Sequence, residues 1–459
     1  MDTEMSAGSP TPNCVKGYQF TNWSKTFECS PELYFEPSNL DEIREILNQA
    51  SRQKKKVKVV GNGHSPSDIQ CTSDYMICLR KFNKIIDVNK ETQQIKAQAG
   101  TTLHELHQEA LKHGLGVSPI PSVSHISLAG LIATGTHSTG ANYGILATNV
   151  TEMTLMDARG EIVKCNDKVN KDIFDAARCH VGAVGIILDI TWQCEKAYRL
   201  CSKRMAGKLD EVLDRLENDL SQTEHYKFHW WPHTNHVAVW DVVKTDKPVK
   251  IKSSWFWDYL IGFHLLQFVH WLSTFFTWLV PYINKYHFTW LKSQPEEVVD
   301  EAENIFTFNC LFPQYVNEWA IPREKTVFVL KSLKKWLDES GFYAHMPVEV
   351  RFVAKDDIYL SPAFGRDVCF IGIIMFRPYG KDVAYEDYWN FYEDLMFSVG
   401  GRPHWGKAHK LGPQALQEVY PSFDDFRNVC TKLDPDRLFV NEYLERSIFP
   451  PGLDCSKGG

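Results

Sequence analysis

A glycine-rich turn that ends in a histidine is the first feature with chemical potential. Residues 59–69 read VVGNGHSPSDI, so Gly61, Asn62 and Gly63 lead directly to His64. Glycine permits positive φ and lets backbone amides approach a ligand closely, as turns that bind phosphates or cofactors require. The turn lacks the G-K-[ST] of a Walker loop and the third glycine of a dinucleotide-binding fingerprint. Alone, it is a weak signal, and an ordinary junction between a strand and a turn is the default interpretation.

Two further loops of small residues lie in the same half of the chain. Residues 122–144, SVSHISLAGLIATGTHSTGANYG, combine glycines with serines and threonines, and HVGAVGIIL follows from residue 180. Backbone amides and hydroxyls in such loops can bind a diphosphate without a lysine. Three such loops predict a large, extended cofactor. The residues expected to contact it are Val60, Gly61, Asn62, Gly63, His64, Ser65, Ser127, Gly130, Gly135, His137, Thr139, Gly140, Gly185 and Ile186.

Three charged residues are candidates for the reaction itself. In VEVRFVA, residues 348–354, a period of two places Glu349 and Arg351 on one face of a strand. The pair is either an exposed ion pair of little energetic value or a cavity-facing pair that orients and polarises a hydroxylated substrate. Lys407, in HWGKAHK, is either a solvated charge or an electrophilic group beside a carbonyl, and spacing does not decide between them.

Three histidines spaced four apart invite a metal-site interpretation. His225, His229 and His233 have the spacing of ligands on one helix face, but the intervening KFHWWPH is strand-like and contains Pro232. We therefore expect no metal site there.

The overall composition is that of a globular chain with two cores. Its 459 residues exceed what one core usually serves, and a net charge of −7 without a basic stripe excludes nucleic acids as partners. Short strands alternate with amphipathic helices from about residue 34 to 194, which predicts an α+β fold. We expect a disordered tail at 1–25, a first domain at 26–199, a sheet-based second domain at 200–395, and a segment at 396–459 that returns to the first domain. The twelve cysteines include no C-x-x-C pair and are expected to be reduced, mostly buried thiols.

An uncharged segment, residues 259–280, breaks this pattern. YLIGFHLLQFVHWLSTFFTWLV is long enough to span a bilayer, yet its histidines, glutamine, serine and threonines recur at helical spacing on about half the circumference. Tryptophans and tyrosines around it suit the headgroup region, so we expect residues 255–291 to lie on a membrane. The alternative is a helix pair buried in the core.

These motifs together resemble a known family. VVGNGHSPSDI, GTHSTG, GIIL, PVEVRF and HWGKAHK resemble the aldonolactone oxidoreductases of the vanillyl-alcohol-oxidase flavoprotein superfamily, over about residues 23–444. The resemblance implies an N-terminal FAD-binding domain, a substrate cap, and a C-terminal strip that returns to the flavin. It also implies that His64 carries FAD covalently at the flavin 8α-methyl. Asn62 stands where the family often has glycine, and asparagine tolerates positive φ.

The resemblance also implies a reaction and roles for the charged residues. The substrate would be an aldonolactone oxidised at C2, with O2 as acceptor and hydrogen peroxide and L-ascorbate as products. Arg351 and Lys407 would stabilise the developing alkoxide, and Glu349 would either orient Arg351 or accept the proton. A dehydrogenase that passes electrons to a cytochrome or quinone is the alternative. A flavin-free scaffold is disfavoured because His64, Glu349, Arg351 and Lys407 are all present. Attachment through residues 255–291 would place the protein on the endoplasmic reticulum membrane.

Overall fold

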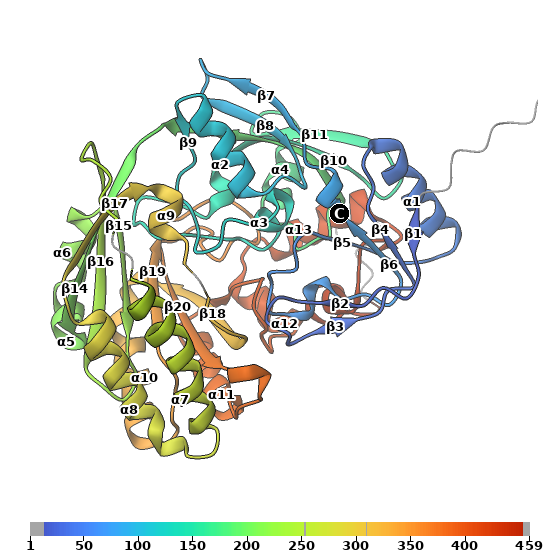
Figure 1. Cartoon of the computed structure of the whole chain (residues 1–459). Coiled ribbons are helices and arrows are strands. Elements are labelled where there is room, and N and C mark those ends of the chain that lie inside the picture. The colour runs from blue at the N-terminus through green and yellow to red at the C-terminus, as the bar shows by residue number, and fades with distance from the viewer. Residues whose placement is uncertain (1–12, 252–253, 309, 453–459) are drawn as a thin grey trace, which may run out of the picture.

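The computed structural model describes residues 13–251, 254–308 and 310–452, which form an α+β fold with three main sheets. The N-terminal half lies at the upper right of Figure 1 and the large sheet at the lower left. Residues 1–12 of the expected tail fall outside the described part of the chain. The remainder of that expectation is wrong: residues 14–15 and 20–21 form strands, and Asn22 and Ser24 are buried.

The first sheet supports the glycine-rich turn. Its strand order is β1 (Cys14–Val15), β4 (Leu33–Phe35), β6 (Tyr75–Cys78) and β5 (Val57–Val60), with β4, β5 and β6 parallel. Helix α1 (Leu40–Arg52) begins after Asn39, an N-cap whose side chain accepts a hydrogen bond from Glu42 N over 3.0 Å. Ile43, Ile46 and Leu47 of α1 are buried in one core with Val57, so the helix fixes the strand that leads into the turn. A hairpin of β2 (Phe20–Thr21) and β3 (Glu28–Cys29) covers this turn, and Trp23 N donates to Gly63 O over 2.8 Å.

A second, antiparallel sheet holds the other two loops. Its order is β11 (Ile162–Asn166), β10 (Val150–Met156), β12 (Ile186–Gln193), β8 (Gln94–Gln98) and β7 (Ile85–Asn89). The helices beside it are α2 (Leu103–Lys112), α3 (Leu128–Ala133) and α4 (Lys171–Ala177), and a short ladder joins β9 (Leu115–Gly116) to β13 (Glu195–Lys196). Thr102 and Glu105 form a capping box at the start of α2. The loop of residues 122–144 thus runs through α3, and the third loop leads into β12.

The large sheet has eight strands and two very different faces. Its order is β17 (Glu296–Glu301), β14 (Arg199–Lys208), β16 (His236–Thr245), β15 (His225–Trp230), β19 (Val348–Val353), β20 (Val368–Phe376), β18 (Gln314–Pro322) and β21 (Arg402–Pro403). One face, with Val348, Val350 and Phe352, packs under α5 (Leu209–Asp214), α6 (Leu216–Gln222), α10 (Thr326–Glu339) and α11 (Glu386–Ser398). The opposite face carries Glu349 and Arg351, as the period of two predicts.

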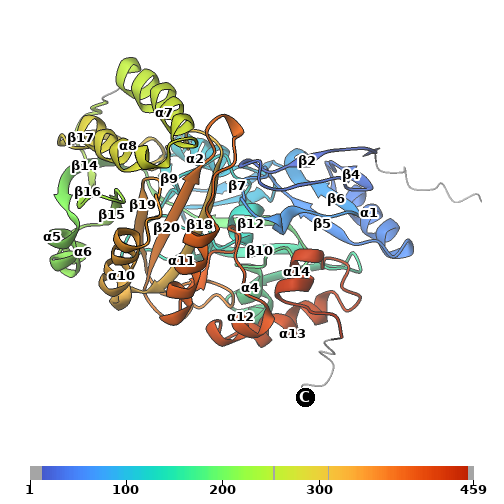
Figure 2. The same ribbon diagram turned by 90° about the horizontal axis from the view of Figure 1, so that it is seen from below.

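The C-terminal segment packs against the N-terminal half. Its helices are α12 (Pro413–Val419), α13 (Phe423–Leu433) and α14 (Glu442–Ser447), and Figure 2 shows them beside α4 and β10. Val57 N donates to Leu438 O over 2.8 Å, and Asn441 Nδ2 donates to Cys71 O over 2.8 Å. This return agrees with the expected C-terminal strip, while the domain boundaries themselves remain predictions. The cysteines that the structure describes are free thiols, most of them buried.

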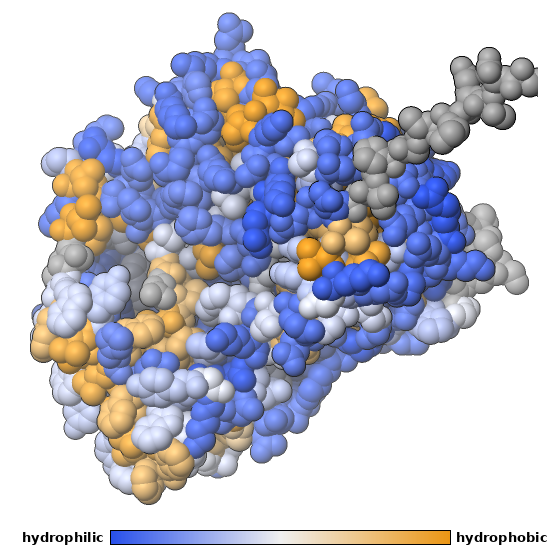
Figure 3. Space-filling view, turned by 45° about the vertical axis from the view of Figure 1, so that its right-hand side comes forward, coloured by the Kyte–Doolittle hydropathy of each residue, from blue (hydrophilic) through white to orange (hydrophobic). Residues whose placement is uncertain are grey.

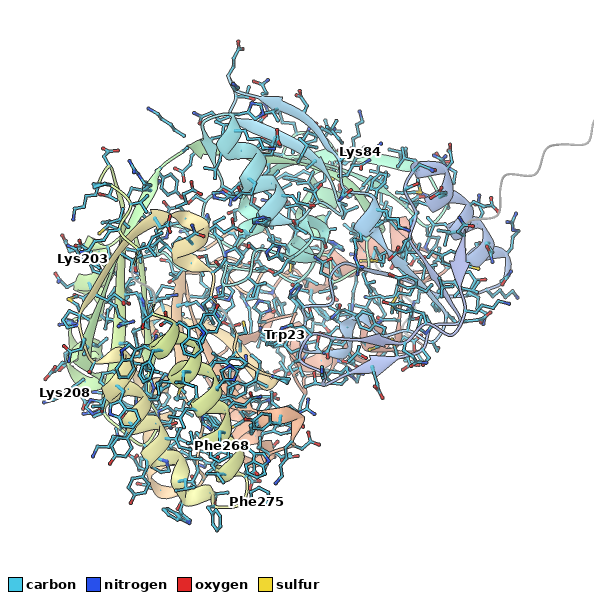
Figure 4. The ribbon with its side chains drawn as sticks, viewed as in Figure 1. Trp23, Lys84, Lys203, Lys208, Phe268 and Phe275 are labelled. Atoms are coloured by element: carbon cyan, nitrogen blue, oxygen red, sulfur yellow. The ribbon has the colours of Figure 1, made fainter. Side chains whose placement is uncertain are left out.

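The uncharged segment forms a broken helical hairpin on the large sheet. It consists of the π-helix η4 (Phe256–Leu265), α7 (Leu266–Ser273), the turn η5 (Thr277–Leu279), α8 (Val280–His287) and the π-helix η6 (Phe288–Lys292). Within the described ranges, every helix is too short or too polar to cross a bilayer. The expected polar face is divided: His264 and Thr277 are exposed, as are Phe268, Phe275 and Phe276, whereas His270 and Ser273 are buried. Burial of these polar groups against the sheet leaves aromatic rings on the outside, and Figure 4 shows Phe268 and Phe275 on this hairpin.

Candidate active site

A cavity of about 1210 Å³ lies between the N-terminal loops and the polar face of the large sheet. It exceeds the usual volume of a small-ligand pocket, roughly 300–1,000 Å³. The loops at residues 58–66, 121–137 and 180–187 line one side, and strands β14, β15, β16, β18, β19 and β20 line the other. There is therefore room for an extended cofactor along the loops and a second molecule against the sheet.

The glycine-rich turn is built for close approach. A Cβ on Gly61 would lie 2.1 Å from Ser127 Oγ, and Gly63 has a φ of +73°, so glycine is required at both positions. Asn62 Nδ2 donates to His125 O over 2.6 Å, which ties the first loop to the second. His64 Nδ1 is buried without a hydrogen-bond partner, and burial lowers the pKa of this ring. An imidazole nitrogen without a hydrogen-bond partner thus belongs to a residue that lines the cavity.

The three loops converge, although four of the expected residues lie elsewhere. Ten of the fourteen residues predicted to contact the cofactor line the cavity, namely Val60, Gly61, Asn62, Gly63, His64, Ser65, Ser127, Gly130, His137 and Gly185. Gly135, Thr139, Gly140 and Ile186 do not, and we correct those four.

Each correction has a structural reason. Gly135, with a φ of +65°, turns the chain after α3. Thr139 Oγ1 donates to Tyr226 O, and Gly140 N donates to Phe352 O over 2.7 Å, so both anchor the loop to the large sheet. Ile186 is fully buried in the core, and its strand neighbour Ile187 faces the cavity instead.

On the sheet side, the strand register brings together charges from distant segments. Glu349 of β19 pairs with Gly372 of β20, which pairs with Glu318 of β18. Because Gly372 has no side chain, Arg351 reaches across β20 to Glu318. Arg351 Nη2 lies 2.6 Å from Glu318 Oε1 and 3.2 Å from Glu349 Oε2. The guanidinium is therefore held between two carboxylates at the cavity wall.

Glu318 is the centre of this network. Its side chain is 3% exposed, and Lys407 Nζ lies 4.0 Å from its Oε2. Burial opposes ionisation of Glu318, but the charges of Arg351, His137 and Lys407 hold its pKa well below the ordinary value. Lys407 therefore does approach the charge pair from the C-terminal strip.

His137 lies between two oxygen acceptors, one of them on Glu318. Its Nδ1 lies 2.9 Å from Ser138 O and its Nε2 lies 3.3 Å from Glu318 Oε1. Both ring nitrogens thus face oxygen acceptors, which is favourable only when a proton occupies each contact. Burial lowers the pKa of the imidazole and Glu318 opposes that shift. The imidazole thus joins the second loop to the carboxylate beside Arg351.

His137, Glu318 and His404 have ligand atoms within 4.8 Å of one another, as the ligands of a metal ion would. Arg351 and Lys407 already supply positive charge to Glu318, and a cation would have to displace them.

The three histidines spaced four apart in the sequence do not lie on one helix. His225 and His229 belong to strand β15, and His233 lies in the following turn with a φ of 63°.

Sequence reasoning missed three residues of this site. Lys58 is 3% exposed, donates to Val181 O over 3.2 Å and lines the cavity; a lysine within the apolar run VKVV was the available signal. Glu318 lies in QYVNEWAIP, where a single carboxylate in a mostly apolar strand was a comparable signal. His180 Nε2 is buried without a partner and also lines the cavity, and its position at the start of the third loop was the only clue.

Comparison with known proteins explains the loop side of the cavity. Residues 31–166 match the model of the FAD binding domain family. The unpartnered nitrogens of His64 and His180, the glycine turn and the Lys58 ammonium fit a dinucleotide that carries a diphosphate. Residues 190–447, more than half of the chain, match the model of the D-arabinono-1,4-lactone oxidase family. The chain belongs to this family.

Individual relatives agree with this assignment. L-gulonolactone oxidase of Scyliorhinus torazame is 48% identical over 434 residues, which cover 94% of this chain and 99% of the relative. L-gulono-1,4-lactone dehydrogenase of Mycobacterium tuberculosis is 29% identical over 435 residues, again 94% of this chain and 99% of the relative. Cholesterol oxidase from B. sterolicum shares the fold, with a TM-score of 0.78 over 97% of this chain and 99% of that one at 16% identity. The family member described here is an FAD-dependent oxidoreductase that acts on an aldonolactone.

Proposed function

We propose that the protein oxidises L-gulono-1,4-lactone at C2 with O2 as acceptor. The products are hydrogen peroxide and a 2-keto lactone that tautomerises to L-ascorbate. The observation that carries the proposal is Arg351, held between Glu318 and Glu349 at the cavity wall with Lys407 beside them. The near full-length similarity to the shark L-gulonolactone oxidase supports this choice of lactone.

The charged residues have different roles in the oxidation at C2. The chemistry that bound FAD supplies is acceptance of a hydride and delivery of two electrons to O2. Loss of the C2 hydroxyl proton develops negative charge on oxygen, and the Arg351 and Lys407 cations stabilise it. Glu318 orients Arg351, which leaves Glu349 as the proton acceptor. Glu349 is half-buried, with its Oε1 3.6 Å from His229 Nε2, so it is held in place at the cavity wall.

The experiment that tests this proposal compares electron acceptors. The purified holoenzyme is reduced with L-gulono-1,4-lactone under argon and then freed of lactone and product, because L-ascorbate itself reduces cytochrome c. Oxygen uptake and peroxide release by the reduced enzyme are then measured beside reduction of added cytochrome c. We expect one peroxide for each lactone oxidised and little cytochrome reduction. Slow oxygen uptake with fast cytochrome reduction would favour the dehydrogenase, an activity carried in name by the mycobacterial relative. Absence of turnover with either acceptor would refute the substrate.

We further propose that His64 forms the covalent bond to the flavin 8α-methyl. Support comes from its Nδ1, which is buried, uncharged and without a partner at the cavity wall. A covalently held cofactor would remain bound when the protein is denatured.

We also propose that the helical hairpin rests on the endoplasmic reticulum membrane. Its outer side exposes large rings, and Figure 3 shows orange and pale residues gathered at the lower left, over this region. The exposed residues are Trp255, Phe256, Trp257, Tyr259, Phe268, Phe275, Phe276, Trp278, Tyr282, Tyr286 and Trp290. Aromatic rings in such number are typical of a surface that inserts into the headgroup region.

A further inference from the structure

The cavity continues beyond the charged network into an outer part lined by two basic side chains. Arg351, Lys227, Trp240 and Arg204 form one row across four neighbouring strands, because each is the direct partner of the next. Arg204 lines the far end of the cavity, and so does Lys292, the last residue of η6. The row therefore leads from Arg351 to the base of the helical hairpin.

The two basic side chains of this outer part differ in their contacts with the two carboxylates that also line it, Glu296 and Asp258. Arg204 Nη1 lies 2.8 Å from Glu296 Oε2, but Arg204 Nε is buried without a hydrogen-bond partner, and the residue is 8% exposed. Lys292 has no carboxylate oxygen within 4.0 Å in the part of the chain that the structure describes. Asp258, the other nearby carboxylate, accepts from Ser254 N over 2.8 Å. The Lys292 ammonium is thus available to an anion, and the Arg204 guanidinium adds positive charge near it.

The proposed reaction produces such an anion. The lactone substrate is neutral, whereas the enediol product is conjugated with the lactone carbonyl and is therefore a vinylogous acid. It gives its proton to water at neutral pH and carries a negative charge. The Lys292 ammonium attracts this product and does little for the neutral substrate.

We infer that Arg204 and Lys292 form an anion-binding subsite that takes the enediol product as it leaves the reaction side. This inference rests on the proposed function for the identity of the anion. A phosphate group of a lipid beside the hairpin has related chemistry, but the subsite is continuous with the reaction side and lies within the cavity.

Product inhibition of the full-length holoenzyme tests the subsite. Oxygen uptake is measured with varied L-gulono-1,4-lactone and added L-ascorbate, in the presence of a metal chelator, for the wild type, Lys292→Met and Lys292→Arg. Because Met removes the charge and Arg keeps it, we expect the ratio of Ki to KM to rise about tenfold in Lys292→Met and to stay near wild type in Lys292→Arg. Lys285→Met is the matched control, since Lys285 is exposed and lies outside the cavity lining.

Further measurements separate the possible failures. Calorimetric titration with L-ascorbate under argon needs no turnover, so binding that is lost in Lys292→Met supports the subsite even if the lactone is not the substrate. Burial lowers the pKa of Lys292 to about 8, so binding should weaken as pH rises through that value in the wild type but not in Lys292→Arg. An unchanged Ki and unchanged ascorbate binding in Lys292→Met overturn the inference. So does a variant that loses only flotation on anionic vesicles, because the subsite would then serve a lipid.

Discussion

Arg351 and Glu318 lie 33 residues apart in the sequence, and their side chains form a 2.6 Å hydrogen bond. The bond passes over Gly372, which lies between their strands and has no side chain to block it. The same Glu318 oxygen faces His137 from the N-terminal half. One buried carboxylate therefore joins the loops that line the cofactor side of the cavity to the strand that carries Arg351.

Replacing Glu318 should reduce turnover more than substrate binding. In Glu318→Gln the amide keeps the size of the side chain but loses the charge that orients Arg351, and we expect kcat to fall about 100-fold with a smaller change in KM. The pH profile should also shift, because Glu318 opposes the lowering of the His137 pKa by burial, and that effect is lost with the charge. Steady-state rates between pH 6 and 9 check this, with Glu152→Gln as the control, since Glu152 pairs with Lys96 away from the cavity. A wild-type pH profile in Glu318→Gln would show that the contact between His137 and Glu318 does not affect turnover.

Gly372 should tolerate one carbon and no more. A Cβ at this position would lie 3.7 Å from both Glu318 Oε1 and Glu349 Cβ, an ordinary contact. Gly372→Ala should therefore keep a KM within about twofold of wild type, whereas the branched side chain of Gly372→Val crosses the path of Arg351 and should raise KM about tenfold. Thermal unfolding of both variants shows whether the sheet itself is disturbed. Equal KM values for the two variants would mean that this part of the wall does not limit the site.

Flavin should leave the denatured protein when His64 is removed. The wild type, denatured in acid and run on a gel, should give a fluorescent band, and His64→Ala should give a dark one, because no other ring nitrogen is placed at that turn. His180→Ala is the control, since His180 also lines the cavity with an unpartnered nitrogen. A dark band from folded wild-type protein would show that FAD is held without a covalent bond.

Membrane attachment should depend on the outer rings of the hairpin. Phe268 and Phe275 are 45% and 57% exposed, and replacing both with serine removes apolar area from the proposed contact surface. We expect flotation with microsomal vesicles to fall several-fold while lactone oxidation continues. Phe328→Ser is the matched control, since Phe328 is 56% exposed in α10, outside the hairpin. Undiminished flotation of the double variant would count against attachment through this surface.

Asp356 should make stability fall as pH rises. Burial raises its pKa from 3.8 to about 6, so its stabilising effect is complete below the unfolded value of 3.8 and is lost as pH rises through about 6. The loss amounts to about 3 kcal/mol at 1.36 kcal/mol per pKa unit. Asp356→Asn, whose amide oxygen can still accept from Ile358 N, should therefore gain in Tm relative to wild type between pH 4 and pH 7.

The adjacent carboxylate is the control for that experiment. Burial opposes ionisation of Asp357, but the nearby Arg178 guanidinium lowers the pKa of this carboxyl. Arg178 Nη2 lies 3.0 Å from Asp357 Oδ1. Its contribution is present above the unfolded pKa and lost as pH falls, so Asp357→Asn should lose Tm relative to wild type over the same interval. A gain for Asp357→Asn that matches the gain for Asp356→Asn would show that the effect is not specific to Asp356.

Much of the site was predictable because it depends on local spacing. Alternation in a strand placed Glu349 and Arg351 on one face, and the N-cap Asn39 marked the start of α1. Glycines indicated the turn before His64, because glycine adopts the positive φ that such a turn requires. Such features depend only on the identity and spacing of a few residues that are adjacent in the sequence.

The partners of these residues were decided by the tertiary structure. Glu318 looks like any lone carboxylate in a strand until the register of β18, β20 and β19 brings it to Arg351. The hairpin showed the same limit. Its periodicity revealed a polar face, but packing against the sheet determined that His270 and Ser273 of this face are buried while His264 and Thr277 are exposed. Local propensity depends on near neighbours in sequence, whereas strand register and burial depend on the free energy of the whole packed core, which no short segment contains.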